Sequence, residues 1–200
     1  MAYQPSSLGI SVLALLRERP MHGYEMFQTL IARHEDRIVK VRPGSLYHVV
    51  YRLAEENLIR PMTIGRAGNR PERTTYEITD TGTTTLTQRV RELVATPVNE
   101  FPQFVVALTE IHNLDRDTAV DALGSRIAAL EFNIAELRAC KQVSTAPGIY
   151  LVALDYLLAT TKAQVNWLRE FVDSLRSERL DWHHASQPDT IVGSRNEVGI

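Results

Sequence analysis

A predicted helix over residues 43–57 carries the side chains whose types and spacing best suit chemistry. Ser45, His48 and Arg52 share one face at spacings of three and four residues, and Tyr47 lies on its flank. An arginine guanidinium can bind both acceptors of a guanine edge, and serine and histidine can hydrogen bond to several bases. Because the major groove of DNA admits one α-helix, this face is predicted to read base edges.

A basic hairpin is predicted directly after this helix. Residues 58–60 and 74–79 suit short strands, and the loop between them contains Gly65 and Gly68, which favour a tight turn. Most of the affinity of a protein for DNA comes from phosphate contacts. We therefore expect phosphate contacts from the basic residues of the loop and from those just before the helix: Lys40, Arg42, Arg66, Arg70 and Arg73.

Further helices are predicted around these elements. Apolar residues recur at helical spacing over residues 6–18 and 22–34, and a fourth helix extends from Thr79 or Asp80 to residue 95. The backbone amides at the start of the second helix, around Gly23 and Tyr24, form a natural phosphate site. This order of helices and hairpin indicates a winged helix-turn-helix.

The C-terminal half is predicted to form a hairpin of two long helices, over residues 115–143 and 149–177. Their apolar residues alternate at spacings of three and four, which is typical of coiled-coil-like packing. Apolar residues off this seam, such as Phe132 and Trp167, need another partner, either the N-terminal half or a second chain. We expect a homodimer held by residues of these helices: Val120, Leu123, Ile127, Leu130, Ile134, Leu158, Val165, Leu168 and Val172.

The expected fold class is mainly α with a small two-stranded β wing: an N-terminal winged helix-turn-helix followed by a C-terminal helical hairpin. Residues 1–98 are expected to form the DNA-binding domain and residues 99–180 the helical dimerisation domain. Residues 181–200 lose the apolar periodicity and gain Ser, Asn, Gly and Pro, so we expect a disordered tail there.

Composition excludes several classes of protein. A hydrophobic fraction of 44% rules out wholesale disorder, and the single cysteine, Cys140, permits no internal disulfide, which fits a cytoplasmic protein. The apolar run over residues 8–16 is too short to span a membrane. The first 95 residues hold 13 Lys and Arg against 10 Asp and Glu, although the whole chain has a net charge of −2. The basic excess therefore lies in the half predicted to face DNA.

Four separated motifs resemble the PadR family of bacterial transcriptional regulators. They are HGYE at residues 22–25, PGSLY at 43–47, LAEENLI at 53–59 and YEITDTG at 76–82. The resemblance implies a homodimeric winged-helix repressor that binds a pseudo-palindromic operator in double-stranded DNA and is released by a small-molecule effector.

The resemblance also implies roles for particular residues. It implies that Gly23 and Tyr24 lie near phosphate, that the wing over residues 66–73 contacts the DNA backbone or minor groove, and that three side chains enter the major groove: Ser45, Tyr47 and His48. The sequence departs from the family pattern at Arg42, where a small capping residue is usual, and at Asn57, where glycine is usual. Asn tolerates the left-handed conformation, so we expect Asn57 to end the helix as a glycine would.

Two other functions compete with this interpretation. An enzyme could use His112, His183 or His184, but no HExxH motif, paired carboxylates or Gly-rich phosphate loop accompanies them, so we expect no enzyme activity, cofactor or metal. The second is a winged-helix protein–protein interaction module without direct DNA binding, which would lack the steep salt dependence of DNA binding. Aromatic residues of the C-terminal half could line an effector pocket, although most suit plain core: Phe101, Phe104, Phe132, Tyr150, Tyr156, Trp167 and Phe171.

Overall fold

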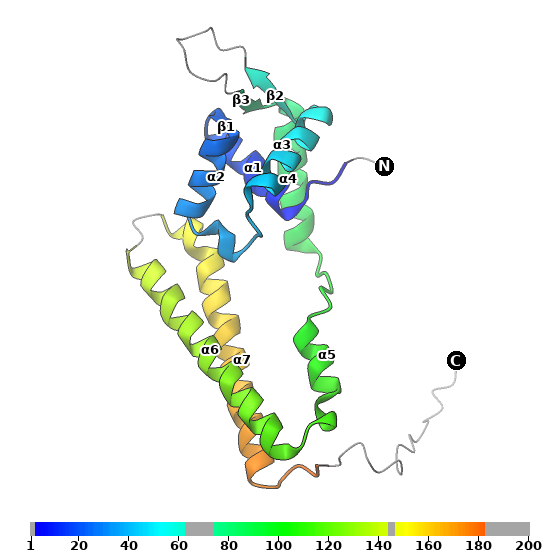
Figure 1. Cartoon of the computed structure of the whole chain (residues 1–200). Coiled ribbons are helices and arrows are strands. Elements are labelled where there is room, and N and C mark those ends of the chain that lie inside the picture. The colour runs from blue at the N-terminus through cyan, green and yellow to red at the C-terminus, as the bar shows by residue number, and fades with distance from the viewer. Residues whose placement is uncertain (1–2, 63–73, 144–146, 183–200) are drawn as a thin grey trace, which may run out of the picture. The chain divides into compact units, whose positions relative to one another are not determined.

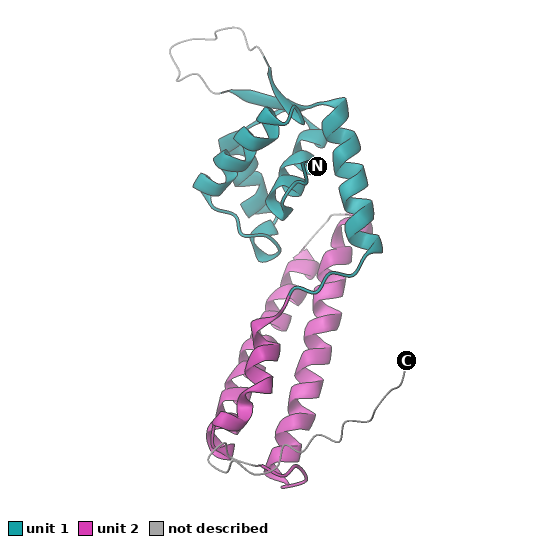
Figure 2. Cartoon of the chain, turned by 90° about the vertical axis from the view of Figure 1, so that its right-hand side faces the viewer, with its two compact units in different colours: residues 1–100 teal, residues 101–200 magenta. Residues whose placement is uncertain are grey.

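The computed structural model describes residues 3–62, 74–143 and 147–182 of the chain (Figure 1). These residues divide into two compact units, Met1–Glu100 and Phe101–Ile200 (Figure 2). Each unit has a hydrophobic core of its own, as expected of a winged helix followed by a helical hairpin.

The N-terminal unit consists of short helices packed beside a small sheet. Its helices are α1 (Ser7–Glu18), α2 (Gly23–Ala32), the 3-10 turn η1 (Glu35–Arg37), α3 (Pro43–Glu55) and α4 (Asp80–Ala95). Ser6 begins α1 by accepting a hydrogen bond from the amide of Gly9 at 3.2 Å, and Thr79 begins α4 by accepting one from Gly82 at 3.0 Å. In both caps, the side-chain oxygen satisfies a backbone amide at the helix start.

The inward faces of α1, α2 and α3 form the core of this unit. Val12, Leu13, Met26, Leu30, Leu46 and Leu53 are all inaccessible to solvent. Burying one such side chain stabilises the fold by about 1.5–3 kcal/mol, so this core fixes how α3 is presented. The side of α3 that carries Leu46 and Leu53 is therefore part of this core.

The sheet contains one strand more than the sequence predicted. Strand β2 (Ile59–Met62) pairs antiparallel with β3 (Thr75–Ile78), and β3 also pairs with β1 (Met21–His22), which precedes α2. A two-residue strand has too little periodicity to be recognised before its partner is known. The loop that joins β2 to β3, residues 63–73, lies outside the described residues, and so do the predicted phosphate contacts Arg66, Arg70 and Arg73.

Asn57 ends α3 in the way the sequence predicted. Its backbone is left-handed, with φ of 56°, and the amide of Leu58 bonds to the carbonyl of Leu53 at 2.9 Å. This is the usual way of closing a helix with a left-handed residue, normally a glycine. The chain can then turn directly into β2.

The C-terminal unit is a hairpin of long helices with a short helix against it. Its elements are α5 (Gln103–Thr109), η2 (Ile111–Asn113), α6 (Arg116–Val143), η3 (Gly148–Leu151) and α7 (Val152–Arg176). Helices α6 and α7 lie side by side along their length (Figures 1 and 2). Ion pairs between Arg169 and Glu131 and between Lys141 and Asp155 also join them.

The predicted seam is used inside the single chain. Two clusters fill the interface between α6 and α7, with Leu123, Leu168 and Val172 in one and Ile134, Leu158 and Val165 in the other. Val120, Ile127 and Leu130 pack at the edges of these clusters. Six of the nine residues expected at the dimer interface are buried within the hairpin, whereas Val120, Ile127 and Leu130 are only partly buried. The role of these residues in dimerisation stays a prediction.

The last described residues are packed rather than free. The indole of Trp182 donates a hydrogen bond to the carbonyl of Leu114 at 3.1 Å and contacts the hairpin core. The rest of the predicted disordered tail, residues 183–200, lies outside the described residues. Among the described helices, none combines the length and apolar character needed to cross a membrane.

Candidate nucleic-acid interface

The N-terminal half of α3 presents an exposed polar surface. Ser45, Tyr47 and His48 are exposed, whereas Leu46 and Val50 on the same helix are buried beneath them. Because the buried residues anchor the helix, its outer face is held in place without using the polar side chains. The groove-reading residues expected from the sequence therefore share one supported surface.

Two basic residues precede this surface. Lys40 and Arg42 are both exposed, and Pro43 occupies the first turn of α3. Arg42 takes the capping position, but its side chain makes no capping hydrogen bond, which agrees with a different start to this helix. The Arg42 guanidinium is thus not used to cap the helix, and it could bind a phosphate.

The start of α2 lies next to the same surface. The ring of Tyr47 lies so close to Gly23 that a β-carbon on Gly23 would be 2.6 Å from Cε1 of the ring. His22 caps α2 by accepting a hydrogen bond from the amide of Glu25 at its Nδ1, at 3.1 Å. Tyr24 is exposed and its hydroxyl accepts a hydrogen bond from Gln28 at 2.8 Å. The start of α2 and the outer face of α3 are therefore neighbours.

Arg52 differs from the other predicted base-reading residues. It pairs with Glu55 at 3.2 Å and with Glu56 at 3.5 Å, and its guanidinium lies 5.7 Å from the centre of the Tyr3 ring. It also lies two turns beyond Ser45, about 10 Å along the helix. To bind a base, Arg52 would have to give up both ion pairs.

The same end of α3 carries a perturbed tyrosine. The hydrogen bond between Tyr51 and Glu55, together with the negative charge of that carboxylate, raises the pKa of the Tyr51 hydroxyl. Because the ordinary pKa of tyrosine already lies well above neutrality, the raised pKa keeps the Tyr51 hydroxyl protonated in neutral solution. This end of the helix is more acidic than its start, which favours the start as the part that approaches DNA.

The base of the wing contains an ion pair that the sequence analysis missed. Arg60 on β2 and Glu77 on β3 face each other in the sheet register, and their side chains meet at 2.7 Å. Opposite charges on facing strand positions were a usable signal, but only once the register of the hairpin was known. The pair ties the two strands together where they lead into the loop.

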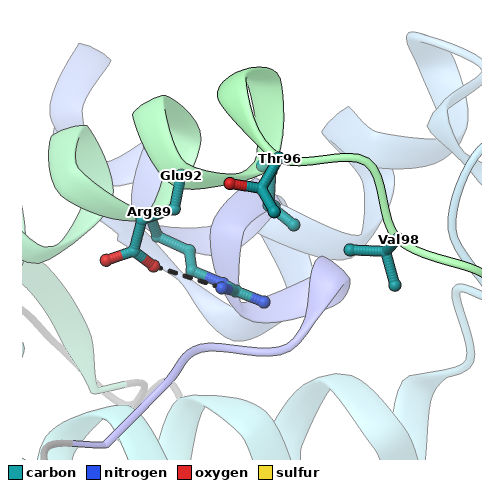
Figure 3. Close-up of a pocket in the computed structure, with 5 residues that line it drawn as sticks. Arg89, Glu92, Thr96 and Val98 are labelled. Atoms are coloured by element: carbon teal, nitrogen blue, oxygen red, sulfur yellow. Dashed lines mark hydrogen bonds and ion pairs between the residues drawn. The ribbon is translucent and has the colours of Figure 1, made fainter. Parts of the chain in front are cut away.

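A shallow pocket lies on α4, and it contains none of the predicted site residues. Its volume is about 250 Å³, and it is lined by Arg89, Glu92, Leu93, Thr96 and Val98 (Figure 3). Arg89 and Glu92 are joined by an ion pair of 3.2 Å, which occupies part of the polar lining.

The aromatic residues that the sequence offered as effector lining do not line this pocket. Trp167 stacks with Phe171 at 5.2 Å between ring centres, and Arg126 lies 3.5 Å from the centre of the Phe104 ring. His112 contacts the carbonyl of Thr109 at 3.2 Å, and the other predicted candidates for catalysis, His183 and His184, lie outside the described residues. In the described part of the chain, no group of three or more His, Cys, Asp or Glu residues could hold a metal ion.

The helices and strands that carry this surface resemble a family of regulators. Residues 12–88 match the family model described as the transcriptional regulator PadR-like family, which is a family of transcription regulators and not of enzymes. The recognition made from the four motifs is therefore confirmed over this part of the chain. No curated protein matched the sequence.

Solved structures share the fold of the chain. PadR of Bacillus subtilis in complex with operator DNA has a TM-score of 0.68 at 21% identity, over 85% of this chain and 99% of that one. The same protein in complex with p-coumaric acid has a TM-score of 0.69 at 21% identity, over 84% and 98% of the two chains. The virulence activator AphA of Vibrio cholerae has a TM-score of 0.65 at 17% identity, over 86% and 99%. The predicted fold class, a winged helix with a helical hairpin, is confirmed.

Proposed function

Because residues 12–88 match the PadR-like family of transcriptional regulators, we propose that this chain is a homodimeric repressor that binds a pseudo-palindromic operator. In this proposal, the start of α3 enters the major groove, with Ser45, Tyr47 and His48 at base edges. The amides at Gly23 and Tyr24 bind phosphate. Further phosphate contacts come from basic residues before α3 and in the loop: Lys40, Arg42, Arg66, Arg70 and Arg73. The protein would act in the cytoplasm, where the DNA lies.

The observation that carries the proposal is the division of α3 into two faces. Leu46, Val50 and Leu53 are buried, while the polar residues at the start of the helix are exposed beside the first turn of α2. The backbone amides at a helix start favour an anion, and an exposed helix face fits the major groove.

Dimerisation is supported by apolar side chains on the outside of the C-terminal unit. Phe132 is 67% exposed and Trp167 is 48% exposed, although each lies on a long helix whose seam is already filled. Other large apolar residues of the unit are exposed as well: Ile149, Tyr150, Val152 and Tyr156. Exposed apolar residues gathered on one unit are typical of surfaces that bind a partner. We propose that a second copy covers them.

Repression and release by an effector are the remaining parts of the proposal. They are supported by the solved complexes of Bacillus subtilis PadR with operator DNA and with p-coumaric acid, whose fold this chain shares. A small molecule would release the DNA if it bound the DNA-free conformation more tightly than the bound one. Titration of the protein–operator complex with a panel of small phenolic acids would test this part separately.

Salt-dependent binding to enriched DNA tests the function directly. The wild-type chain would first be used to enrich duplexes from a random pool, with the region upstream of its own coding sequence as a second probe. Affinity for the enriched duplex should fall by about a thousandfold between about 50 mM and about 200 mM salt if at least about six phosphates are contacted. Binding that is weak for every duplex, or that ignores salt, would favour the protein–protein module instead.

Sedimentation tests the dimer independently of DNA. The wild-type chain should sediment as a dimer at micromolar concentration, and Trp167→Ser should shift it toward monomer. Lys162→Ser, at an exposed position of the same helix that does not share a face with Trp167, is the matched control and should leave the dimer intact. A wild-type monomer would contradict the proposal.

A further inference from the structure

We infer that Gly23 is a positioning residue for Tyr47: it leaves the space in which the Tyr47 ring is held for DNA recognition. The inference rests on the proposed function, because it assigns a role within the same DNA-binding surface. It concerns the absence of a side chain at Gly23 and not the backbone amide of that residue.

The distances around Gly23 carry the inference. A β-carbon on Gly23 would lie 2.6 Å from Cε1, 3.2 Å from Cδ1 and 3.3 Å from Cζ of Tyr47. The first distance is well inside van der Waals contact between carbon atoms. One edge of the ring therefore occupies the space that any other residue at this position would need.

The ring is supported on one side only. Tyr47 remains 54% exposed although its edge lies against the first residue of α2. A β-carbon on Gly23 would lie 2.6 Å from the ring, so the ring has to move away from α2, and long side chains on a helix prefer only two χ1 rotamers to move between. Swinging outward costs little packing, because much of the ring is already in solvent. A side chain at position 23 should therefore change the stability of the protein little, and its main effect should be on the affinity for DNA.

The same reasoning separates two possible uses of the glycine. If Gly23 acts by letting the DNA backbone approach α2, a methyl group there would weaken binding whether or not Tyr47 is present. If it acts by placing Tyr47, the methyl group would matter only while the ring is there. Alanine keeps the backbone amide, so neither case confuses the loss of a phosphate-binding N–H with the gain of a side chain.

A double-mutant cycle distinguishes these uses. Gly23→Ala, Tyr47→Ala and the double variant would be measured against the duplex enriched by the wild-type chain, at one salt concentration. Gly23→Ala should weaken binding about tenfold in the wild-type background and by less than about twofold in the Tyr47→Ala background, since the two residues are in contact. Thermal unfolding of each variant should show that all of them fold.

Gly44→Ala is the matched control within the same surface. A β-carbon on Gly44 would meet no atom within 4 Å, so it cannot displace the ring. Any effect of Gly44→Ala on binding should be the same with and without Tyr47. This control separates a general effect of alanine near DNA from an effect transmitted by the ring.

The position of the ring can also be measured without DNA. Magnetisation transfer between the α-protons of Gly23 and the ring protons of Tyr47 should be strong in the wild-type chain. In Gly23→Ala, the transfer from the α-proton of the substituted residue to that ring should be lost. Equal costs of Gly23→Ala in both backgrounds, with normal wild-type binding, would overturn the positioning role and leave the proposed function intact. A wild-type chain that binds no enriched duplex would overturn both.

Discussion

Gly82 lies against the backbone of Leu58: a β-carbon on Gly82 would be 2.0 Å from the Leu58 carbonyl oxygen. The same oxygen accepts hydrogen bonds from the amide and the hydroxyl of Thr79, each at 3.0 Å. One carbonyl thus fixes the start of α4 to the strand that leads into the wing.

Gly82→Ala should therefore destabilise the N-terminal unit. The backbone cannot give way without breaking the Thr79 hydrogen bonds, so the free energy of unfolding should fall by about 1–3 kcal/mol or more. Denaturant unfolding would measure it. Gly124→Ala is the control, because a β-carbon on Gly124 in α6 meets nothing within 4 Å and should leave stability unchanged or higher.

The cap at the start of α2 should contribute measurably to stability. His22→Ala removes the acceptor for the Glu25 amide, which should lower the free energy of unfolding by about 1 kcal/mol. His22→Asn supplies another good capping side chain and should restore most of the loss. Equal destabilisation by both substitutions would show that the ring of His22 matters for packing and not for capping.

The ion pair between α1 and the end of α2 should give a small dependence of stability on pH. Two hydrogen bonds of 2.6 and 2.7 Å join Arg33 to Glu18 and lower the pKa of the Glu18 carboxyl. A carboxyl with a lowered pKa in the folded state stabilises the protein above its unfolded pKa, and this contribution is lost as the pH falls through the folded pKa.

Arg33→Gln should remove that dependence. Both side chains are 46% exposed, so solvent screening limits the loss to below about 1 kcal/mol at neutral pH. The difference in stability between wild type and variant should vanish in acid. A difference that persists after Glu18 is protonated would mean that Arg33 acts through other contacts.

Side chains on α3 and on the wing loop should affect DNA binding in different ways. His48→Ala should change which duplexes are preferred, by about 1–3 kcal/mol at the base that His48 contacts, whereas Arg70→Ala should weaken binding to all sequences about equally. Competition between enriched and scrambled duplexes would measure both. Arg52→Ala tests whether Arg52, which is paired with Glu55 and Glu56, reads a base. A change in sequence preference would show that Arg52 leaves these two carboxylates on binding DNA.

The sequence predicted the local features of the N-terminal unit more fully than the partners of the long helices, for a physical reason. Local signals such as the cap at Thr79, the buried face of α3 and the left-handed Asn57 depend on near neighbours, so they could be identified in advance. A seam with spacings of three and four looks the same whether its partner is the next helix or another chain. Leu168 and Val165 are buried in the predicted hairpin between α6 and α7, and the spacing alone does not distinguish this use from a contact with a second chain.

The candidate site shows the same limit. Ser45, Tyr47 and His48 were predicted from the pattern on one helix, but the closeness of Tyr47 to Gly23 depends on how α2 packs against α3. Likewise, the spacing of Arg52 along the helix places it on the exposed face with Ser45 and His48. Its ion pairs with Glu55 and Glu56 are seen only in the conformation of its side chain. Residue type and periodicity identify a face, whereas the partner of each side chain is set by tertiary structure.

The separation between two operator half-sites tests the central claim most directly. A dimer that reads a symmetric site requires half-sites about 10 base pairs apart, one turn of duplex. Affinity would be measured for the enriched duplex and for the same duplex with about 5 base pairs inserted between its half-sites, which places them on opposite faces of the DNA. A loss of affinity of at least about tenfold on insertion is the result predicted for two winged helices held at a fixed spacing. Unchanged affinity would contradict it.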